Sequence, residues 1–201
     1  MYLSEETFRK NGVKADIHWY STVGVMFPNC LKFSDKLNEI RLQKGITTHF
    51  FNDLYRIDKD QRKAYYRDTK NGNADVIVDY DFMHIVPPMN APDFLKPIAA
   101  ANGYVDVDQG TLQHNKFKNV FALGDAANLP TAKTAAGIMS QAPVLVHNLI
   151  KQHEGQQLTG SYDGYQSCPL FVGDKKLMLI EFKYGNQPAE TFSSSMQTEP
   201  N

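Results

Sequence analysis

The sequence predicts an α/β fold that carries an antiparallel β-meander and a carboxyl-terminal hairpin. A strand, a glycine-containing loop and a helix follow one another over residues 15–44, and three strand-like stretches separated by short turns fill residues 47–86. Further on, the apolar run 120–123 ends in Gly124 and Asp125 before a helix-favouring segment. Repeated strand-to-helix order is typical of dinucleotide-binding, Rossmann-like domains.

Composition narrows the classes of function. The chain has 201 residues, enough for a buried core, and 21 Lys plus Arg balance 22 Asp plus Glu to give a net charge of −1. That balance favours neither a nucleic-acid partner nor broad attraction to anionic lipid. No apolar run approaches the ~20 residues that cross a bilayer, and the amino terminus lacks a signal-peptide pattern. The sequence by itself therefore predicts a soluble chain.

The amino-terminal elements can be assigned in order. A polar helix is expected over residues 4–10 and a strand over residues 15–20. A loop with Gly24 then leads to a helix over residues 33–44, which Gly45 stops. Because Gly24 stands alone, without the further glycines of a phosphate-binding loop, we interpret this region as scaffold rather than as a nicotinamide site.

A meander of three strands is predicted next, over residues 47–57, 63–67 and 76–86. Short turns of Lys, Asp, Asn and Gly separate these stretches, as they do in antiparallel sheets. Pro87 and Pro88 are expected to end the last strand, because proline cannot donate to a ladder. His84 is interpreted as a structural residue of that strand.

The second half of the chain begins with less regular segments. A short helix and loop are expected over residues 92–103 and a short strand or turn over residues 104–108. A buried strand over residues 120–123 precedes a helix over residues 134–150, where Pro143 should cause a kink or a local break.

The carboxyl-terminal part predicts a hairpin after a polar loop at residues 151–160. Its strands are residues 170–172 and 177–184, split by a Gly-Asp-Lys-Lys turn. The polar tail 193–201 is expected to be disordered.

A ligand site is expected where the strand 120–123 meets the helix that follows. The start of a helix offers unpaired N–H groups and about half a positive charge to an electron-rich group. Gly124 lets a ligand approach the backbone closely, and Asp125 can accept hydrogen bonds from sugar-alcohol hydroxyls.

These residues also carry a resemblance. The run 119–125, Asn-Val-Phe-Ala-Leu-Gly-Asp, is similar to the second flavin-binding fingerprint of two-dinucleotide-domain flavoproteins, in which the terminal Asp holds the ribityl chain of FAD. With segments 83–89, 103–108, 128–136 and 162–170, the chain resembles the eukaryotic mitochondrial sulfide:quinone oxidoreductase family from its start to about residue 192.

The resemblance implies a partial Rossmann-like flavoprotein with four parts. Residues 1–88 would be part of the second dinucleotide-binding-like domain, and residues 89–152 would return to the FAD domain with its fingerprint strand and helix. Residues 153–192 would form the hairpin with a redox cysteine, followed by the tail 193–201. Because no Gly-x-Gly-x-x-Gly follows a strand, the chain looks like the carboxyl-side portion of such an enzyme, cut at both ends.

The resemblance also assigns roles to residues. Cys168 matches the redox cysteine that takes up sulfide and carries the persulfide, whereas Cys30 matches no redox cysteine. The FAD-binding residues would be Gly124, Asp125, Lys133, Thr134, Ala135 and Ala136. His114 stands where many related flavoproteins have Thr. No metal site is expected, since the two cysteines lack metal-ligand spacing.

The implied substrates and partners are hydrogen sulfide, ubiquinone, and a small thiol or sulfite as sulfur acceptor. The family acts at the mitochondrial inner membrane, which it would reach through segments absent here. We expect the 201-residue chain alone to bind FAD weakly and to be inactive. Two alternatives stay open: another flavoprotein quinone reductase of the NADH dehydrogenase type, which needs a full glycine fingerprint near Gly24, and a non-catalytic fragment.

Overall fold

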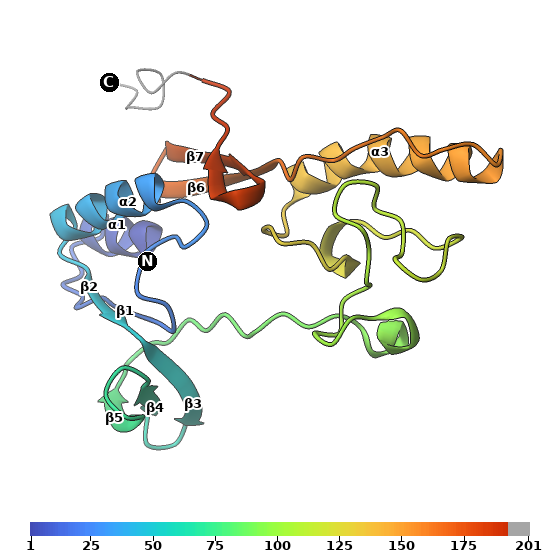
Figure 1. The fold of residues 1–201 in the computed structure, drawn as a ribbon. Coiled ribbons are helices and arrows are strands. Elements are labelled where there is room, and N and C mark those ends of the chain that lie inside the picture. Colours follow the sequence, from blue (N-terminus) through green and yellow to red (C-terminus); the bar gives the residue numbers. More distant parts are fainter. Residues whose placement is uncertain (193–201) are drawn as a thin grey trace. The chain divides into compact units, whose positions relative to one another are not determined.

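The computed structural model describes residues 1–192, which fall into two compact units (Figure 1). Unit 1 consists of Met1–Pro87 and Phe171–Leu177, and unit 2 of Pro88–Leu170 together with the chain from Met178 onward. Each unit is described by itself. The predicted disorder of the tail 193–201 lies outside the described residues.

Unit 1 begins with a helix, α1 (Tyr2–Lys10), and continues as a βαβ unit. The strand β1 (His18–Ser21) is joined through α2 (Leu31–Gln43) to β2 (Thr47–Phe50), and the two strands pair in parallel. This confirms the predicted strand-to-helix order. Helix α2 ends before a glycine in the left-handed region, Gly45 at φ +67°, which an L side chain would resist.

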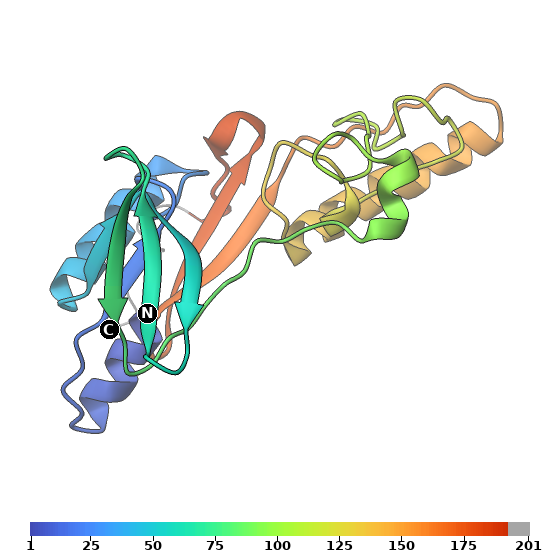
Figure 2. The ribbon, with the colours of Figure 1, turned by 90° about the horizontal axis from the view of Figure 1, so that it is seen from below.

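The predicted meander is confirmed. Strands β3 (Asn52–Asp58), β4 (Lys63–Asp68) and β5 (Ala74–Asp79) form an antiparallel sheet in sequence order (Figure 2). Buried Ala64 and Tyr66 alternate with more exposed neighbours along β4, as expected for a sheet with one covered face.

Two strand boundaries differ from the prediction. The expected single strand 47–57 is two strands, because Phe51 adopts φ +60° and turns the chain between β2 and β3. The expected strand 76–86 ends at Asp79, well before the prolines. Asp79 pairs with Lys63, the first residue of β4, so β4 offers no partner to the residues that follow Asp79.

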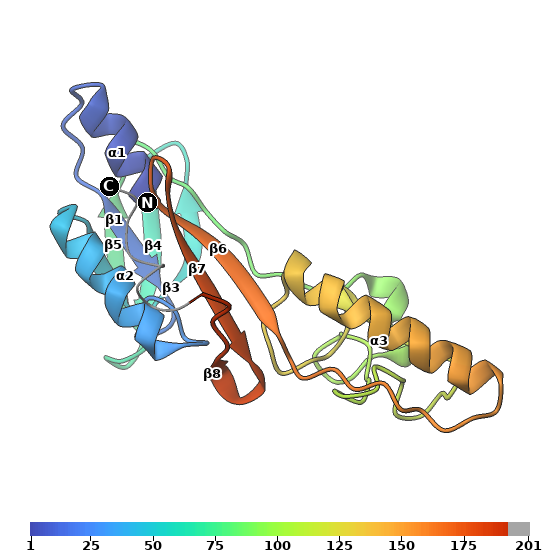
Figure 3. The ribbon, with the colours of Figure 1, turned by 90° about the horizontal axis from the view of Figure 1, so that it is seen from above.

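Unit 2 contains the long helix α3 (Ala135–His153) and most of the hairpin β6 (Gln166–Gly173) and β7 (Lys176–Lys183), whose turn belongs to unit 1 (Figure 3). The short strand β8 (Gln187–Pro188) extends the sheet in the order β6-β7-β8. Three 3-10 turns complete the unit: η1 (Asp93–Ile98), η2 (Gly124–Ala126) and η3 (Tyr184–Asn186). The predicted hairpin is confirmed.

The chain from η1 to α3 is irregular and is held by single bridges. Val105 forms isolated bridges with Ala99 and with Ala127, and Val107 with His114. Val105, Val107 and Ala127 are buried and form a small core with partly buried apolar neighbours: Leu95, Ile98, Ala122, Ala126 and Leu129.

The strand predicted in this region is wrong; of the kink or local break predicted at Pro143, the break is wrong and the kink stays a prediction. Residues 120–123 form no regular strand: among the described residues, the segment has one isolated bridge, Gln113 with Phe121, and so lacks the neighbouring strand that a ladder requires. Helix α3 runs through Pro143 without a break. Pro143 is exposed, so the carbonyl of Met139 that loses its helical donor is open to water.

Candidate functional site

The turn before α3 is built on Gly124. Its φ of +62° favours glycine, and a Cβ there would lie 2.9 Å from Cγ1 of Ile138. The backbone N–H of Gly124 donates to Oε1 of Gln141 at 2.7 Å. Asp125 follows in η2 with an exposed side chain. The turn therefore presents a carboxylate to solvent while its backbone is bonded to the interior of α3.

The start of α3 is capped by Thr134. The Thr134 hydroxyl accepts from the N–H of Gly137 at 3.0 Å and donates to Oε1 of Gln166 at 2.5 Å. Within residues 1–192, no acceptor takes the N–H groups of Ala135 and Ala136. These two donors lie at the positive end of a 19-residue helix, where an electron-rich ligand group would be stabilised.

Lys133 points back onto the chain that precedes it. Its Nζ donates to the carbonyl of Ala127 at 2.7 Å and lies 4.1 Å from the ring centroid of Tyr104. Burial lowers the pKa of Lys133, and the negative charge of Asp125 opposes that shift. The ammonium is thus a partly desolvated charge beside Asp125, in a setting where it could meet an anionic ligand.

Cys168 is a free, half-buried thiol on β6. Pro169 follows it, and a residue before proline is restricted to the extended conformation of a strand. Burial raises the pKa of the Cys168 thiol, so the thiol is protonated at neutral pH. Cys30, the other free cysteine, is buried in unit 1 at the start of α2.

The structure brings three predicted parts of the site together within unit 2. Gln141 joins the Gly124 turn to α3, and Gln166 joins the cap of α3 to β6. Side chains alternate along a strand, so Cys168 lies on the same side of β6 as Gln166. The candidate site therefore comprises the Gly124 turn, the start of α3 and the part of β6 that carries Cys168.

Sequence reasoning missed the polar side chains that join these parts. Gln141, Tyr162 and Gln166 are buried, at 2%, 4% and 0% exposure. The sequence carried a signal for Gln141: Gly137, Gln141 and Asn148 repeat at helical spacing, and in the structure they are the buried residues of α3. Polar residues on the buried face of a helix indicate internal hydrogen bonding.

His114 proves to be a structural residue. The residue is 3% exposed, Nδ1 accepts from the N–H of Lys116 at 2.9 Å, and Nε2 lies 3.0 Å from the carbonyl of Ile98. Because Nδ1 accepts, Nε2 must carry the proton and donate. Both ring nitrogens are thus used in holding the irregular segment.

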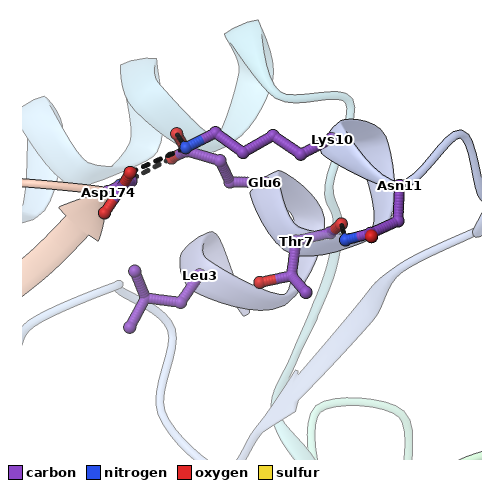
Figure 4. Close-up of a pocket in the computed structure, with 6 residues that line it drawn as sticks. All are labelled: Leu3, Glu6, Thr7, Lys10, Asn11 and Asp174. Atoms are coloured by element: carbon purple, nitrogen blue, oxygen red, sulfur yellow. Dashed lines mark hydrogen bonds and ion pairs between the residues drawn. The ribbon is translucent and has the colours of Figure 1, made fainter.

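A pocket of about 340 Å³ lies elsewhere, in unit 1, and contains none of the predicted site residues (Figure 4). Lys10 lies between two carboxylates in its wall, with Nζ 3.2 Å from Glu6 and 2.7 Å from Asp174. Both carboxylates are thus paired with the ammonium, and Lys10 lowers the pKa of Asp174. The pocket is therefore better explained as an ion-paired contact between α1 and the hairpin turn than as a ligand site.

Comparison with known proteins identifies relatives along the whole chain. No family model matches. The mitochondrial sulfide:quinone oxidoreductase of Mus musculus is 39% identical over 203 residues, covering 99% of this chain and 45% of the relative. That of Dictyostelium discoideum is 42% identical over 204 residues, covering 99% and 44%. The chain thus spans just under half the length of these relatives.

Solved structures agree on the fold. A chain in the mitochondrial ATP synthase structure from Tetrahymena thermophila is 27% identical with a TM-score of 0.84, covering 99% of this chain and 49% of its own. The sulfide:quinone oxidoreductase of Aquifex aeolicus is 16% identical with a TM-score of 0.75, covering 90% and 46%. The second likeness supports the fold alone, which is the predicted α/β flavoprotein fold over part of its length. This chain is homologous, along its whole length, to the mitochondrial sulfide:quinone oxidoreductases.

Proposed function

We propose that this chain is the carboxyl-side portion of a flavin-dependent enzyme that oxidises hydrogen sulfide and passes the electrons to ubiquinone. The observation that carries the proposal is the 39–42% identity to two mitochondrial sulfide:quinone oxidoreductases over 99% of the chain. Activity belongs to the longer protein, because the chain matches only 44–45% of those relatives.

The residues at the start of α3 fit one end of FAD. Ala135 and Ala136 offer free N–H donors, Asp125 offers an exposed carboxylate to ribityl hydroxyls, and Lys133 offers a positive charge. Gly124 and Thr134 shape the turn and the cap between them. Bound FAD would supply a two-electron acceptor that passes the electrons from sulfide on to quinone. We expect weak binding by this chain alone, since no diphosphate-binding glycine motif occurs in it.

Cys168 is the proposed site of sulfide chemistry. Hydrosulfide would attack the sulfur of Cys168 while it is disulfide-bonded to a second cysteine of the longer protein. The S–S bond breaks, the second sulfur leaves as a thiolate, and Cys168 keeps the added sulfur as a persulfide. A small thiol or sulfite would then take that sulfur. The high pKa of the free Cys168 thiol disfavours it as a nucleophile and is compatible with an electrophilic role.

The proposed location is the mitochondrial inner membrane, and it is supported by the fact that the named relatives are mitochondrial. Within residues 1–192, no helix has the length and apolar character needed to span a bilayer. Attachment of the longer protein would therefore involve segments other than the helices described here.

The experiment uses a chimera in which this chain replaces the matching portion of the mouse enzyme. Stopped-flow absorbance follows flavin bleaching by sulfide in the parent chimera and in its Cys168→Ser and Cys30→Ser variants. We expect Cys168→Ser to retain FAD and to lose bleaching by orders of magnitude, because a hydroxyl cannot exchange with a disulfide. Cys30→Ser is the matched control and should bleach normally.

A flavin-loaded chimera whose Cys168→Ser variant bleaches at the parent rate would refute the role of Cys168. Loss of bleaching in a flavin-loaded Cys30→Ser variant would overturn the division of roles between the two cysteines. Asp125→Ala tests the cofactor site separately: we expect it to lose FAD affinity by about 1–3 kcal/mol, the cost of removing a charged acceptor. Unchanged flavin retention on dialysis would contradict that assignment.

A second candidate is a non-catalytic component of a larger assembly. It is favoured by one observation, the 27% identical Tetrahymena chain that belongs to an ATP synthase structure and is covered to 49% by this chain. A chimera that folds without binding FAD, together with co-purification of this chain with ATP synthase, would favour it over the enzyme.

A further inference from the structure

A continuous network of buried polar groups runs through the candidate site. It starts at the N–H of Gly124, which donates to Gln141, and Gln141 interacts with the hydroxyl of Tyr162. The amide of Gln166 donates to the same hydroxyl at 2.9 Å, and its oxygen accepts from Thr134. Three segments that are far apart in sequence are thus joined by the buried side chains of Gln141, Tyr162 and Gln166 and by the partly buried Thr134.

Both polar side-chain atoms of the central residue, Gln166, are used. Gln166 is 0% exposed, its Oε1 accepts from Thr134 and its Nε2 donates to Tyr162. The Tyr162 hydroxyl donates to the carbonyl of Tyr165 at 2.7 Å, which leaves its lone pairs free to accept from the amide of Gln166. A satisfied network in a low-dielectric interior is rigid, because breaking one bond leaves a buried group without a partner.

The packing around Gln166 is equally close. A Cβ on Gly137 would lie 2.4 Å from Oε1 and 2.5 Å from Nε2 of Gln166, so the glutamine amide rests directly on the backbone of the first turn of α3. Cys168 is two residues along β6 on the same side of the strand. Gln166 therefore ties β6 to the helix start two residues before Cys168.

We propose that Gln166 is a positioning residue that holds Cys168 against the start of α3 and the Gly124 turn. This role rests on the proposed function, in which the sulfur of Cys168 reacts. Misplacing a reacting sulfur by about 1 Å can lower the reaction rate about a hundredfold. Thr134 acts through Gln166, and its hydroxyl serves both the helix cap and this contact.

The test measures the thiol and needs neither FAD nor sulfide. Iodoacetamide alkylation of Cys168 in the 201-residue chain is followed by peptide mass spectrometry between pH 6.5 and 10, while hydrogen exchange in α3 checks folding. We expect Gln166→Ala to accelerate alkylation about tenfold and to move its midpoint toward the ordinary thiol pKa of ~8.5, because the strand loosens and the thiol gains water.

The paired variants Thr134→Val and Thr134→Ser separate positioning from general damage. Valine removes the donor to Gln166 and should raise the alkylation rate several-fold, whereas serine keeps the hydroxyl and should restore the parent rate and pH profile. Thr191→Val is the matched control in the same unit, because the Thr191 hydroxyl bonds Glu181 and not Gln166. It should leave Cys168 unchanged.

An unchanged alkylation rate and pH profile in Gln166→Ala would overturn the proposal. Acceleration in Thr191→Val equal to that in Thr134→Val would also overturn it. If Gln166→Ala loses α3 protection, the Thr134 pair decides. A positive result leaves the sulfide chemistry to the bleaching assay, so the two proposals can fail separately.

Discussion

Different kinds of contact stabilise the interior of unit 1 and the interior of unit 2. In unit 1, stacked aromatic rings connect the parallel strands to the meander: Tyr20 stacks on His49 and on Tyr66, with centroids 4.2 Å apart in each pair. In unit 2, buried amides of Gln141 and Asn148 join α3 to irregular segments, and the buried amide of Gln166 joins β6 to the start of α3. Apolar and aromatic packing tolerates small shifts, whereas an amide that loses its partner is penalised in full. The candidate site lies in the unit of the second kind.

The largest expected change in stability comes from removing an apolar side chain from the core of unit 1. Leu37→Ala deletes a side chain that is 2% exposed on α2, and we expect a loss of about 2–5 kcal/mol in the free energy of unfolding. Trp19, the single tryptophan of the chain, lies in β1, so its fluorescence during urea unfolding reports on unit 1. The control is Leu42→Ala on the same helix, where the side chain is 58% exposed and the midpoint should hardly move.

The next largest change in stability is expected from adding a methyl group inside unit 2. Gly137→Ala places a methyl group 2.4–2.7 Å from the Gln166 side chain, which is buried and bonded at both ends and cannot move aside. We expect a loss of about 1–3 kcal/mol from overpacking, seen as faster hydrogen exchange in α3. The Trp19 transition should stay in place, because Trp19 belongs to the other unit.

Gly110→Ala is the matched control for that substitution. Its Cβ would meet Ser161 Oγ at 3.4 Å, an ordinary contact, and its φ is not in the left-handed region. Equal acceleration of α3 exchange in both variants would show that unit 2 is sensitive to any added methyl, and the contrast between the units would then fail.

This contrast explains what the sequence could predict. Periodicity and turn residues indicated α1, α2, the meander and the hairpin, because each is defined by local pattern and by neighbours close in sequence. The strand expected at residues 120–123 required a neighbouring strand that a local pattern cannot supply. Gln141 and Gln166 were missed for a related reason: their partners lie 17 and 32 residues away, and only the fold brings them together.

A smaller effect concerns the titration of Cys168. Burial raises the pKa of the native thiol, whereas the unfolded thiol has its ordinary pKa of ~8.5. Above that pH the unfolded state loses its proton first, so the native state loses stability from ~8.5 up to the raised native pKa. Alkylation at pH 8 should therefore be slower in the native chain than in urea. A native rate equal to the rate in urea would contradict the burial of this thiol.

The smallest effect has the opposite sign and again concerns unit 1. Arg62 adopts φ +52° in the turn between β3 and β4, a conformation that costs an L residue about 1–2 kcal/mol and a glycine little. Part of that gain is lost to the greater freedom of glycine in the unfolded chain. We therefore expect Arg62→Gly to stabilise unit 1 by about 0.5 kcal/mol, read from the Trp19 transition in urea.

Lys59→Gly in the same turn provides the control, because Lys59 has no positive φ and gains nothing from glycine. It should lower the midpoint slightly, so the two variants should move the Trp19 transition in opposite directions. The carbonyl of Arg62 accepts from the N–H of Tyr80 at 3.0 Å, a backbone bond that glycine preserves. If Arg62→Gly also lowers the midpoint, then the arginine side chain stabilises the turn by more than its backbone conformation costs. Side-chain contacts would in that case dominate even the turns of unit 1.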